Sequence, residues 1–234
     1  MFRARRPRAA QLTPPPGGDG ATGRVTGVVL LLPGGFLRSR RGPLKVAELG
    51  LRDLTAELTA RGRPHGIAVH LLRYRYSGWN GADADTAVDT RWALDELARR
   101  YGDVPVVLVG NSLGGRAAFW CAGHRNVVGV AGIAPWLPSG DPVEQLAGRR
   151  VLIVHGTGDR SAANAVQSLE YALRARPVSA DLARYEAPGA NHYLIREAAD
   201  ISAITTSFSL AALDAEPAPP APGTVCTRLP AARS

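Results

Sequence analysis

The chain has 234 residues, of which 45% are hydrophobic and 21% are charged, and its formal net charge is +8. This length suits a single domain with a full hydrophobic core, and no apolar run is long enough to span a bilayer. Residues 1–24 carry +4 and residues 215–234 carry +1, so only +3 remains on the rest, which predicts no nucleic-acid partner and no membrane partner.

The two ends of the chain differ in composition from the residues between them. Residues 1–24 are rich in Pro, Gly and Arg, and residues 215–234 are rich in Pro and Ala, which predicts a disordered tail on each side of one domain, residues 25–214. The N-terminal tail has neither the apolar segment nor the cleavage site of a secretory signal. Cys121 and Cys226 lie far apart in the sequence and indicate no disulfide framework. We expect a cytoplasmic protein, and the sequence leaves its oligomeric state open.

Strand and helix patterns alternate through residues 25–214. Apolar runs predict six strands, at residues 25–32, 67–74, 106–109, 127–134, 151–155 and 181–186. Apolar residues at helical spacing predict helices at 46–61 and 84–101, a short one at 142–147, one containing Val166 and Leu173, and a last one containing Ile201 and Phe208. This alternation predicts an α/β fold, an open and mostly parallel six-stranded sheet with helices on both faces.

The sequence PVVLVGNSLGG, residues 105–115, combines a strand, a tight turn and the start of a helix. The apolar residues are typical of a buried parallel strand, and a helix-forming stretch follows the turn at residues 116–121. Gly110 and Gly114 give clearance on the two sides of Ser112, and Gly115 lets the helix pack closely on the sheet. In this setting the pattern G-x-S-x-G predicts an exposed serine hydroxyl next to the first N–H groups of a helix.

With this motif the chain resembles the α/β-hydrolases, in particular their small lidless esterases and dienelactone-hydrolase-like members. The resemblance covers residues 25–214 and is strongest at Gly110-Asn111-Ser112-Leu113-Gly114. It implies an α/β-hydrolase fold that lacks the first two strands of the family, with its six strands in the spatial order 2-1-3-4-5-6. It also implies a Ser-Asp-His catalytic triad. No cluster of metal ligands occurs in the sequence, and no cofactor is implied.

A serine hydroxyl is a weak nucleophile and needs an adjacent base. In this family the base is a histidine that follows the acid in the chain, and His192 in PGANHYL occupies that place, between the sixth strand and the last helix. We therefore predict that His192 activates Ser112. The remaining histidines are interpreted as structural residues: His65, His70, His124 and His155.

Two aspartates are candidates for the acid that orients His192. Asp159 in VHGTGDRS lies just beyond the fifth strand, where the family carries its acid, and Asp141 follows the fourth strand, as in some family members. We predict Asp159, whose carboxylate would hold the imidazole tautomer and stabilise the imidazolium. The alternative interpretation is that Asp159 only caps the helix that begins near Ala162.

The tetrahedral intermediate of an acyl transfer needs N–H donors for its oxyanion. Leu113, directly after the nucleophile, is predicted to supply one, and the loop after the first strand is predicted to supply the other, from Gly35 or else from Phe36. Many relatives have a histidine where this chain has Pro33, and a plain glycine turn is the alternative interpretation of this loop. Neither a P-loop nor the pattern G-x-G-x-x-G fits it.

The sequence thus predicts a serine hydrolase that cleaves small carboxylic esters through an acyl-enzyme intermediate. Phe36, Trp79 and Trp136 are expected to rim a shallow, open binding site for a small ester-like substrate. The same triad could act on a thioester, an amide or a carbon–carbon bond. A non-catalytic binding protein with this fold is the alternative from another functional class, and the acyl and leaving groups stay open.

Overall fold

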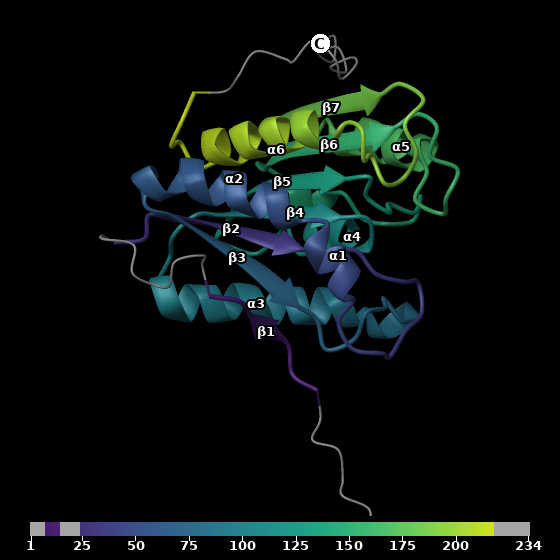
Figure 1. Ribbon diagram of the computed structural model, residues 1–234. Coiled ribbons are helices and arrows are strands. Elements are labelled where there is room, and N and C mark those ends of the chain that lie inside the picture. The colour runs from purple at the N-terminus through teal and green to yellow at the C-terminus, as the bar shows by residue number, and fades with distance from the viewer. Residues whose placement is uncertain (1–7, 15–23, 218–234) are drawn as a thin grey trace, which may run out of the picture.

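A seven-stranded sheet forms the centre of the molecule (Figure 1). The structure is a computed structural model in which residues 8–14 and 24–217 are described. The strands lie in the order β1-β3-β2-β4-β5-β6-β7, and every neighbouring pair is parallel except β1 and β3. Their bounds are β1 Gln11–Leu12, β2 Gly27–Leu32, β3 Ile67–Arg73, β4 Val106–Asn111, β5 Val127–Ile133, β6 Arg150–Gly156 and β7 Asp181–Ala187.

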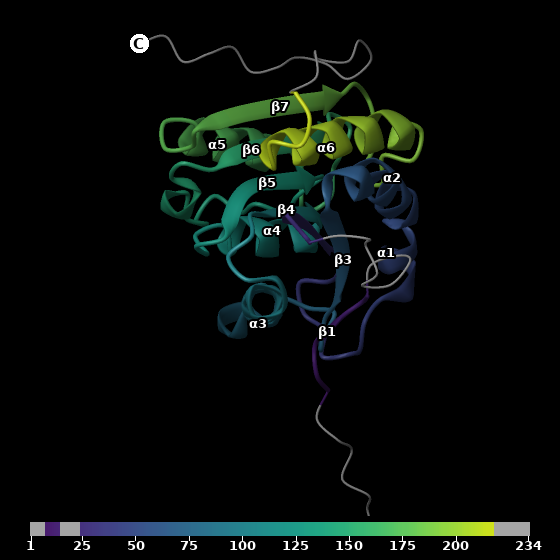
Figure 2. The same cartoon turned by 90° about the vertical axis from the view of Figure 1, so that its left-hand side faces the viewer.

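Helices cover both faces of the sheet, which gives the molecule three layers (Figure 2). The helices α1, α2 and α6 lie on one face, and α3, α4 and α5 lie on the other. Their bounds are α1 Lys45–Leu49, α2 Arg52–Gly62, α3 Asp85–Tyr101, α4 Leu113–Trp120, α5 Ala165–Ala175 and α6 Ala198–Ala212. Short 3-10 helices lie in the connections at Arg63–His65, Gly81–Asp83 and Glu144–Leu146. Among the described residues, no helix combines the length and the apolar composition needed to cross a bilayer.

The strands are buried from both sides because their side chains alternate between the two helical layers. In β2, Val28 and Leu30 belong to the apolar cluster that includes α3 and α4, while Val29 and Leu31 belong to the cluster that includes α2 and α6. All residues of β2 are buried, as expected for the centre of a parallel sheet. The near-continuous apolar runs of the sequence are therefore strands that helices cover on both faces.

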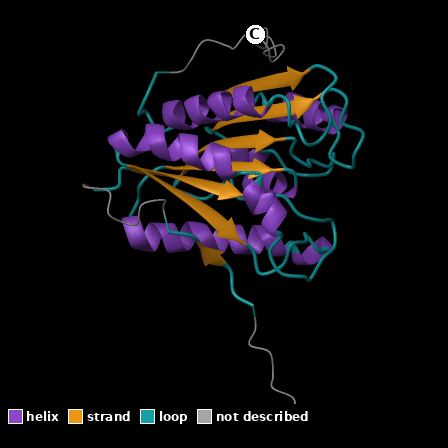
Figure 3. Cartoon of the chain, viewed as in Figure 1, coloured by secondary structure: helices purple, strands orange, loops and turns teal. Residues whose placement is uncertain are grey.

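The structure confirms the α/β class and the predicted order of the six parallel strands, and it adds one strand at the edge. This strand, β1, comes from the segment predicted as a tail and runs antiparallel to β3 (Figure 3). Thr13 N–H donates to Leu71 O at 3.0 Å, and Leu71 N–H donates to Thr13 Oγ1 at 3.0 Å. The prediction of six strands is one strand short because a two-residue strand has no periodicity to detect.

The folded domain is longer at both ends than the predicted residues 25–214. Besides β1 it includes Ala215, whose N–H donates to Leu210 O at 2.9 Å, and Glu216, which pairs with Arg61 at 2.5 Å. The predicted tails otherwise fall on residues 1–7, 15–23 and 218–234, which lie outside the described residues, as does Cys226.

The helix predicted at residues 46–61 is in fact two helices, α1 and α2, which break at Gly50. Glycine has a low helix propensity, and α1 has no buried residue that would hold it in line with α2. Val46 on α1 is 68% exposed, whereas Leu54 on α2 is 6% exposed. The apolar spacing in this segment therefore describes α2 alone.

Removal of residues 1–14 is expected to lower the free energy of unfolding by about 1–3 kcal/mol. The deletion takes away the hydrogen bonds between Thr13 and Leu71 and uncovers the edge of β3. Urea unfolding of the full chain and of a chain that begins at Pro15 measures the difference. A chain that begins at Arg8 keeps these bonds and is the matched control. Equal stability of the two shortened chains would contradict the role given to β1.

Candidate active site

The carboxyl ends of the parallel strands meet at one edge of the sheet, on the right of Figure 1. Ser112 follows β4, Asp159 follows β6 and His192 follows β7. Loops that leave parallel strands at the same edge share a crevice, which is where open α/β sheets bind their ligands. The sheet therefore brings together three residues that span 80 positions of the sequence.

The turn between β4 and α4 holds Ser112 in a backbone conformation that few residues adopt. Ser112 has φ 52° and ψ −114°, and strain of this kind gathers at functional turns. The turn packs tightly on the neighbouring strand, because a Cβ on Gly114 would lie 2.0 Å from Leu32 O. Only glycine fits at this position, which is the physical reason for the second glycine of the G-x-S-x-G pattern.

Ser112, His192 and Asp159 form a continuous hydrogen-bonded chain. His192 Nε2 lies 3.0 Å from Ser112 Oγ, and His192 Nδ1 lies 2.7 Å from Asp159 Oδ2. An ionised carboxylate only accepts, so Nδ1 carries a proton and donates it to Asp159. In the neutral imidazole Nε2 is then the acceptor for the Ser112 hydroxyl. This geometry allows His192 to take the serine proton while the hydroxyl oxygen attacks an electrophile.

Asp159 is buried and keeps its negative charge. It is 6% exposed, and its Oδ1 accepts from Ser161 N–H at 2.9 Å. Burial acts to raise the pKa of this carboxyl, but the hydrogen bonds from Ser161 and His192 to its charged form outweigh burial, so the pKa of Asp159 lies below its ordinary value. Its Oδ2 also lies 3.0 Å from Nε2 of His155. Asp159 Oδ2 therefore faces two imidazole rings, those of His192 and His155.

The loops that carry Asp159 and His192 pack directly on each other. A Cβ on Gly156 would lie 2.2 Å from Ala190 O, and Gly158 N–H donates to Ala190 O at 3.0 Å. The glycines of the VHGTGD segment therefore let the two backbones approach closely. This contact fixes the separation between the acid and the histidine.

Asp141, the alternative acid in the sequence, is engaged elsewhere. Its Oδ2 accepts from Arg116 Nε at 2.7 Å, and its Oδ1 accepts from Arg116 Nη2 at 2.6 Å. A bidentate pair of this kind uses both oxygens of the carboxylate. The structure therefore brings Asp159, and not Asp141, to His192.

The first residue of α4 and the loop after β2 lie beside Ser112, because a Cβ on Gly34 would lie 3.5 Å from Ser112 Cβ. Leu113 is the first residue of α4, so its N–H has no acceptor within the helix. The loop after β2 packs on this residue, because a Cβ on Gly35 would lie 2.9 Å from Leu113 Cδ2. Phe36 N–H, the alternative donor of this loop, is already donated to Ser77 O at 2.8 Å. Leu113 and Gly35 are therefore the candidates for oxyanion donors.

Asn80 ties the loop after β2 to the loop after β3, a role that the sequence analysis missed. Its N–H donates to Leu37 O at 3.0 Å, and its Oδ1 accepts from Ser39 N–H at 2.8 Å. Its Nδ2 donates to Asp85 Oδ2 at 2.8 Å. Asn80 has φ 65°, in the left-handed region that Asn tolerates better than most residues. Its place in a glycine-rich turn is the only sequence signal for this role.

Solved structures share this architecture. A protein of unknown function from Agrobacterium tumefaciens, provisionally assigned to the alpha/beta hydrolases, has a TM-score of 0.64 and 17% identity, covering 91% of this chain and 94% of that chain. An alpha/beta serine hydrolase without a lid, from Xanthomonas campestris, has a TM-score of 0.55 and 16% identity over 90% of each chain. The chain has the α/β-hydrolase fold.

A further structure with the α/β-hydrolase fold is a monoacylglycerol lipase from Paleococcus ferrophilus. Its TM-score is 0.58 at 13% identity, covering 87% of this chain and 98% of that chain. Identities this low show a shared fold and not a shared substrate. No protein-family model and no curated protein matches the sequence. The assignment to the α/β-hydrolase fold therefore depends on the structure.

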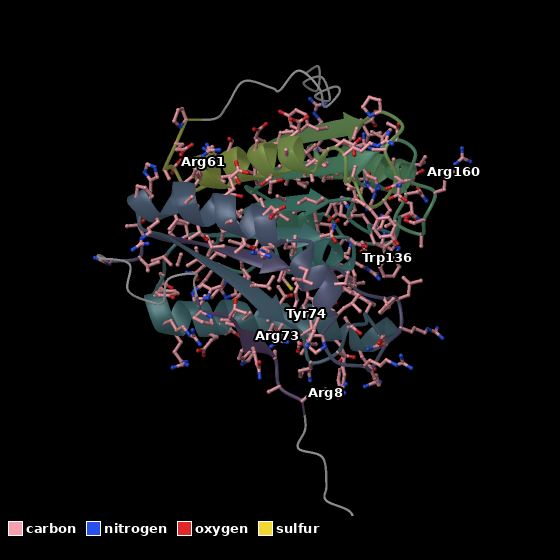
Figure 4. All side chains as sticks on the ribbon, in the orientation of Figure 1. Arg8, Arg61, Arg73, Tyr74, Trp136 and Arg160 are labelled. Atoms are coloured by element: carbon pink, nitrogen blue, oxygen red, sulfur yellow. The ribbon has the colours of Figure 1, made fainter. Side chains whose placement is uncertain are left out.

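The sequence predicted that Trp79 lies at the rim of the site, but the structure buries it. It is 4% exposed, and the Arg116 guanidinium carbon lies 4.0 Å from the centre of its ring. The Trp136 ring lies 4.4 Å from the same carbon, so two indoles contact one charge. Trp136 is half-buried, lies on the side where the strands end (Figure 4), and donates its backbone N–H to Ser112 O at 3.0 Å. The substrate contact predicted for Trp136 stays a prediction.

Large apolar side chains are exposed on two loops that leave the carboxyl ends of the strands. Tyr193 and Ile195, on the loop after β7, are 76% and 77% exposed. Phe36, on the loop after β2, is 49% exposed, as expected of a rim residue, and its contact with substrate stays a prediction. Tyr193 and Ile195 were not predicted from the sequence, although the apolar run directly after His192 was the signal for them.

Residues 8–14 and 24–217 contribute neither a set of metal ligands nor a reactive thiol to the site. Within these ranges no group of three or more His, Cys, Asp or Glu side chains is placed to hold a metal ion. Cys121 is buried after α4, and burial raises the pKa of its thiol to about 12. This sulfur therefore stays protonated and is a poor nucleophile.

Proposed function

We propose that the protein is a serine hydrolase that cleaves small carboxylic esters through an acyl-enzyme intermediate. The observation that carries the proposal is the hydrogen-bonded chain from Ser112 Oγ through His192 to Asp159, with distances of 3.0 and 2.7 Å. The strained turn at Ser112, the N–H of Leu113 at the start of α4 and the packing of the Gly35 loop on Leu113 support the same reaction.

In the proposed first half-reaction, Ser112 Oγ attacks the carbonyl carbon of the ester while His192 Nε2 takes the hydroxyl proton. The carbonyl oxygen becomes an oxyanion and accepts hydrogen bonds from the N–H groups of Leu113 and Gly35. The bond to the alcohol oxygen then breaks, and His192 gives its proton to the departing alkoxide. The acyl group stays on Ser112, and the ionised Asp159 stabilises the imidazolium between the two proton transfers.

Water releases the acyl group in the second half-reaction. His192 takes a proton from water, and the oxygen of that water attacks the acyl carbon. The bond to Ser112 Oγ breaks, and His192 returns its proton to the serine. The products are a carboxylic acid and an alcohol, and the proposed cycle needs no cofactor.

Two alternatives share these residues. The triad could act on a thioester, an amide or a carbon–carbon bond, or the fold could bind a ligand without catalysis. A fluorophosphonate probe separates catalysis from binding, because it reacts with an activated serine. We expect mass spectrometry to find the probe on Ser112 of the wild-type chain and no adduct on Ser112→Ala. A folded wild-type chain without an adduct would overturn the proposed function.

Small acyl groups are the proposed substrates because the connection between β5 and β6 is short. Residues 134–149 hold a single 3-10 helix, Glu144–Leu146, at the place where many α/β-hydrolases insert a lid. A broad apolar surface without a cover would favour association of the protein. We therefore expect kcat/KM for p-nitrophenyl esters to fall as the acyl chain grows beyond about four to six carbons. A maximum at long chains, or a jump in rate at the micelle threshold, would contradict this expectation.

The rate is expected to rise with pH. His192 must be neutral to accept the serine proton, and a histidine base loses its proton between about pH 5 and 8. The pKa of Asp159 lies below its ordinary value, so this carboxylate is already ionised throughout that window and adds no second step. The measurement is kcat/KM for one soluble ester from about pH 5 to pH 9. A flat profile would count against a histidine base.

A further inference from the structure

Asp159 has a second imidazole neighbour besides His192. His155 lies near the end of β6 and is fully buried, and its Nε2 is 3.0 Å from Asp159 Oδ2, the same oxygen that accepts from His192. The same Nε2 also lies 2.7 Å from Ala163 O. His155 was predicted to be a structural residue, and the structure places it against the acid of the candidate triad.

The neighbours of the His155 ring determine where its proton lies. The two atoms near Nε2 are a carboxylate and a carbonyl oxygen, which only accept, so Nε2 carries a proton and donates to them. A neutral imidazole carries one proton, so Nδ1 is unprotonated when Nε2 donates. Nδ1 has no hydrogen-bond partner among the described residues. Burial lowers the pKa of His155, although the hydrogen bond to Asp159 favours the charged form. His155 is therefore a neutral donor directed at Asp159.

The neighbouring strand adds charged groups to this cluster. Glu186 on β7 lies opposite His155 in the register of the sheet, and Arg184 lies opposite Ile153. Arg184 is 1% exposed, pairs with Glu186, and donates to Ala165 O on α5 at 3.0 Å. Its positive charge opposes a second positive charge on His155. Among the described residues, the titratable and charged groups set against His155 are Asp159, Arg184 and Glu186, and His192 shares the Oδ2 atom of Asp159 with it.

We infer that His155 is a positioning residue of the site, which holds the Asp159 carboxylate in the orientation that His192 requires. Oδ1 of Asp159 is fixed by Ser161 N–H at 2.9 Å, and Oδ2 accepts from His155. With both oxygens held, the carboxylate cannot rotate about its terminal bond, and Oδ2 stays aimed at His192 Nδ1. The inference rests on the proposed function, in which Asp159 orients the base.

The His155 N–H also takes up part of the negative charge on Asp159 Oδ2. An oxygen that accepts from two donors attracts each of them less strongly than an oxygen that accepts from one. Loss of the His155 donor therefore changes the attraction between Asp159 and a protonated His192, and with it the pH at which the His192 ring loses its proton.

Two substitutions at His155 separate hydrogen-bond donation from side-chain volume. His155→Phe keeps an aromatic ring and removes the donor, whereas His155→Gln keeps an N–H donor near the place of Nε2. His70→Phe is the matched control, because His70 is also fully buried but contacts Tyr101 at 2.9 Å, away from the triad. The readouts are the NMR titration of the His192 ring in the intact protein, and kcat and KM for p-nitrophenyl acetate.

We expect His155→Phe to move the midpoint of the His192 titration by about 0.5 pH unit or more. The same change is expected to lower kcat by about 10- to 100-fold with little change in KM. His155→Gln restores both readouts toward their wild-type values, and His70→Phe alters neither. The inference is overturned by an unchanged titration in His155→Phe, or by a Gln variant as impaired as the Phe variant.

The two readouts also distinguish a failure of this inference from a failure of the proposed function. The titration needs no hydrolysis, so it tests the contact between His155 and Asp159 even in a chain that cleaves no ester. If the wild type is active and Ser112→Ala is not, normal titration and kcat in His155→Phe overturn only the positioning role. Should His155→Phe not fold, His155→Leu removes the donor with a smaller apolar side chain and is judged by the same outcomes.

Discussion

Replacement of Ser112 with Ala is expected to lower kcat by about 10⁴- to 10⁶-fold. The change removes the hydroxyl that lies 3.0 Å from His192 Nε2 and that forms the acyl bond in the proposed reaction. The oxyanion donors and the binding surface remain, which sets the residual rate. The fold should persist, because alanine differs from serine only by the hydroxyl and the backbone strain at φ 52° is present in both.

The measurement is kcat for a soluble ester together with the thermal unfolding curve of each protein. Ser179→Ala is the matched control, because Ser179 lies after α5, away from the candidate triad, and its hydroxyl donates to Arg176 O at 3.4 Å. This control should keep the wild-type kcat. A folded Ser112→Ala protein with a rate near that of the wild type would show that the nucleophile is another group.

The parts of the fold that could be predicted from the sequence are those with a long, repeated signal. The consecutive apolar residues of β2 and β4 identify strands that are covered on both faces. In contrast, β1 has two residues, and its position depends on hydrogen bonds to the edge of β3. The break between α1 and α2 depends on which residues of α1 find a surface to pack against. Gly50 is a local signal for this break, but it does not by itself fix where the helix ends, and β1 has no local signal.

The candidate site also has residues that could be predicted from the sequence and residues that could not. Ser112, Asp159 and His192 each lie in a short motif at the end of a strand, so the order of the strands alone brings them to one edge. The contact of Trp79 with Arg116 was not predictable, because it depends on the packing of segments far apart in the sequence. The contact of His155 with Asp159 joins residues only four positions apart, but it depends on how the backbone folds after β6, which no local pattern shows. Local patterns therefore identify the groups that would react, whereas the residues that hold them require the structure.

Asp159→Asn is expected to lower kcat by about 10⁴-fold while the protein stays folded. The carboxylate accepts the proton of His192 Nδ1 at 2.7 Å, and an amide nitrogen in that place donates instead. The imidazole then changes tautomer, so Nε2 carries the proton and cannot accept one from Ser112. The new side chain keeps an oxygen for Ser161 N–H, so the loop after β6 retains one of its anchors.

Asp141→Asn separates this loss of catalysis from a loss of stability. The Asp141 and Arg116 side chains are 4% and 12% exposed, and removal of one charge leaves the guanidinium unpaired beside Trp79 and Trp136. Breaking a buried ion pair in this way costs about 3 kcal/mol. We therefore expect Asp141→Asn to lower the unfolding midpoint in urea and to keep kcat close to the wild-type value, because the contact between Asp159 and His192 is untouched. The opposite pattern, a folded Asp141→Asn protein without activity and an active Asp159→Asn protein, would make Asp141 the acid of the reaction.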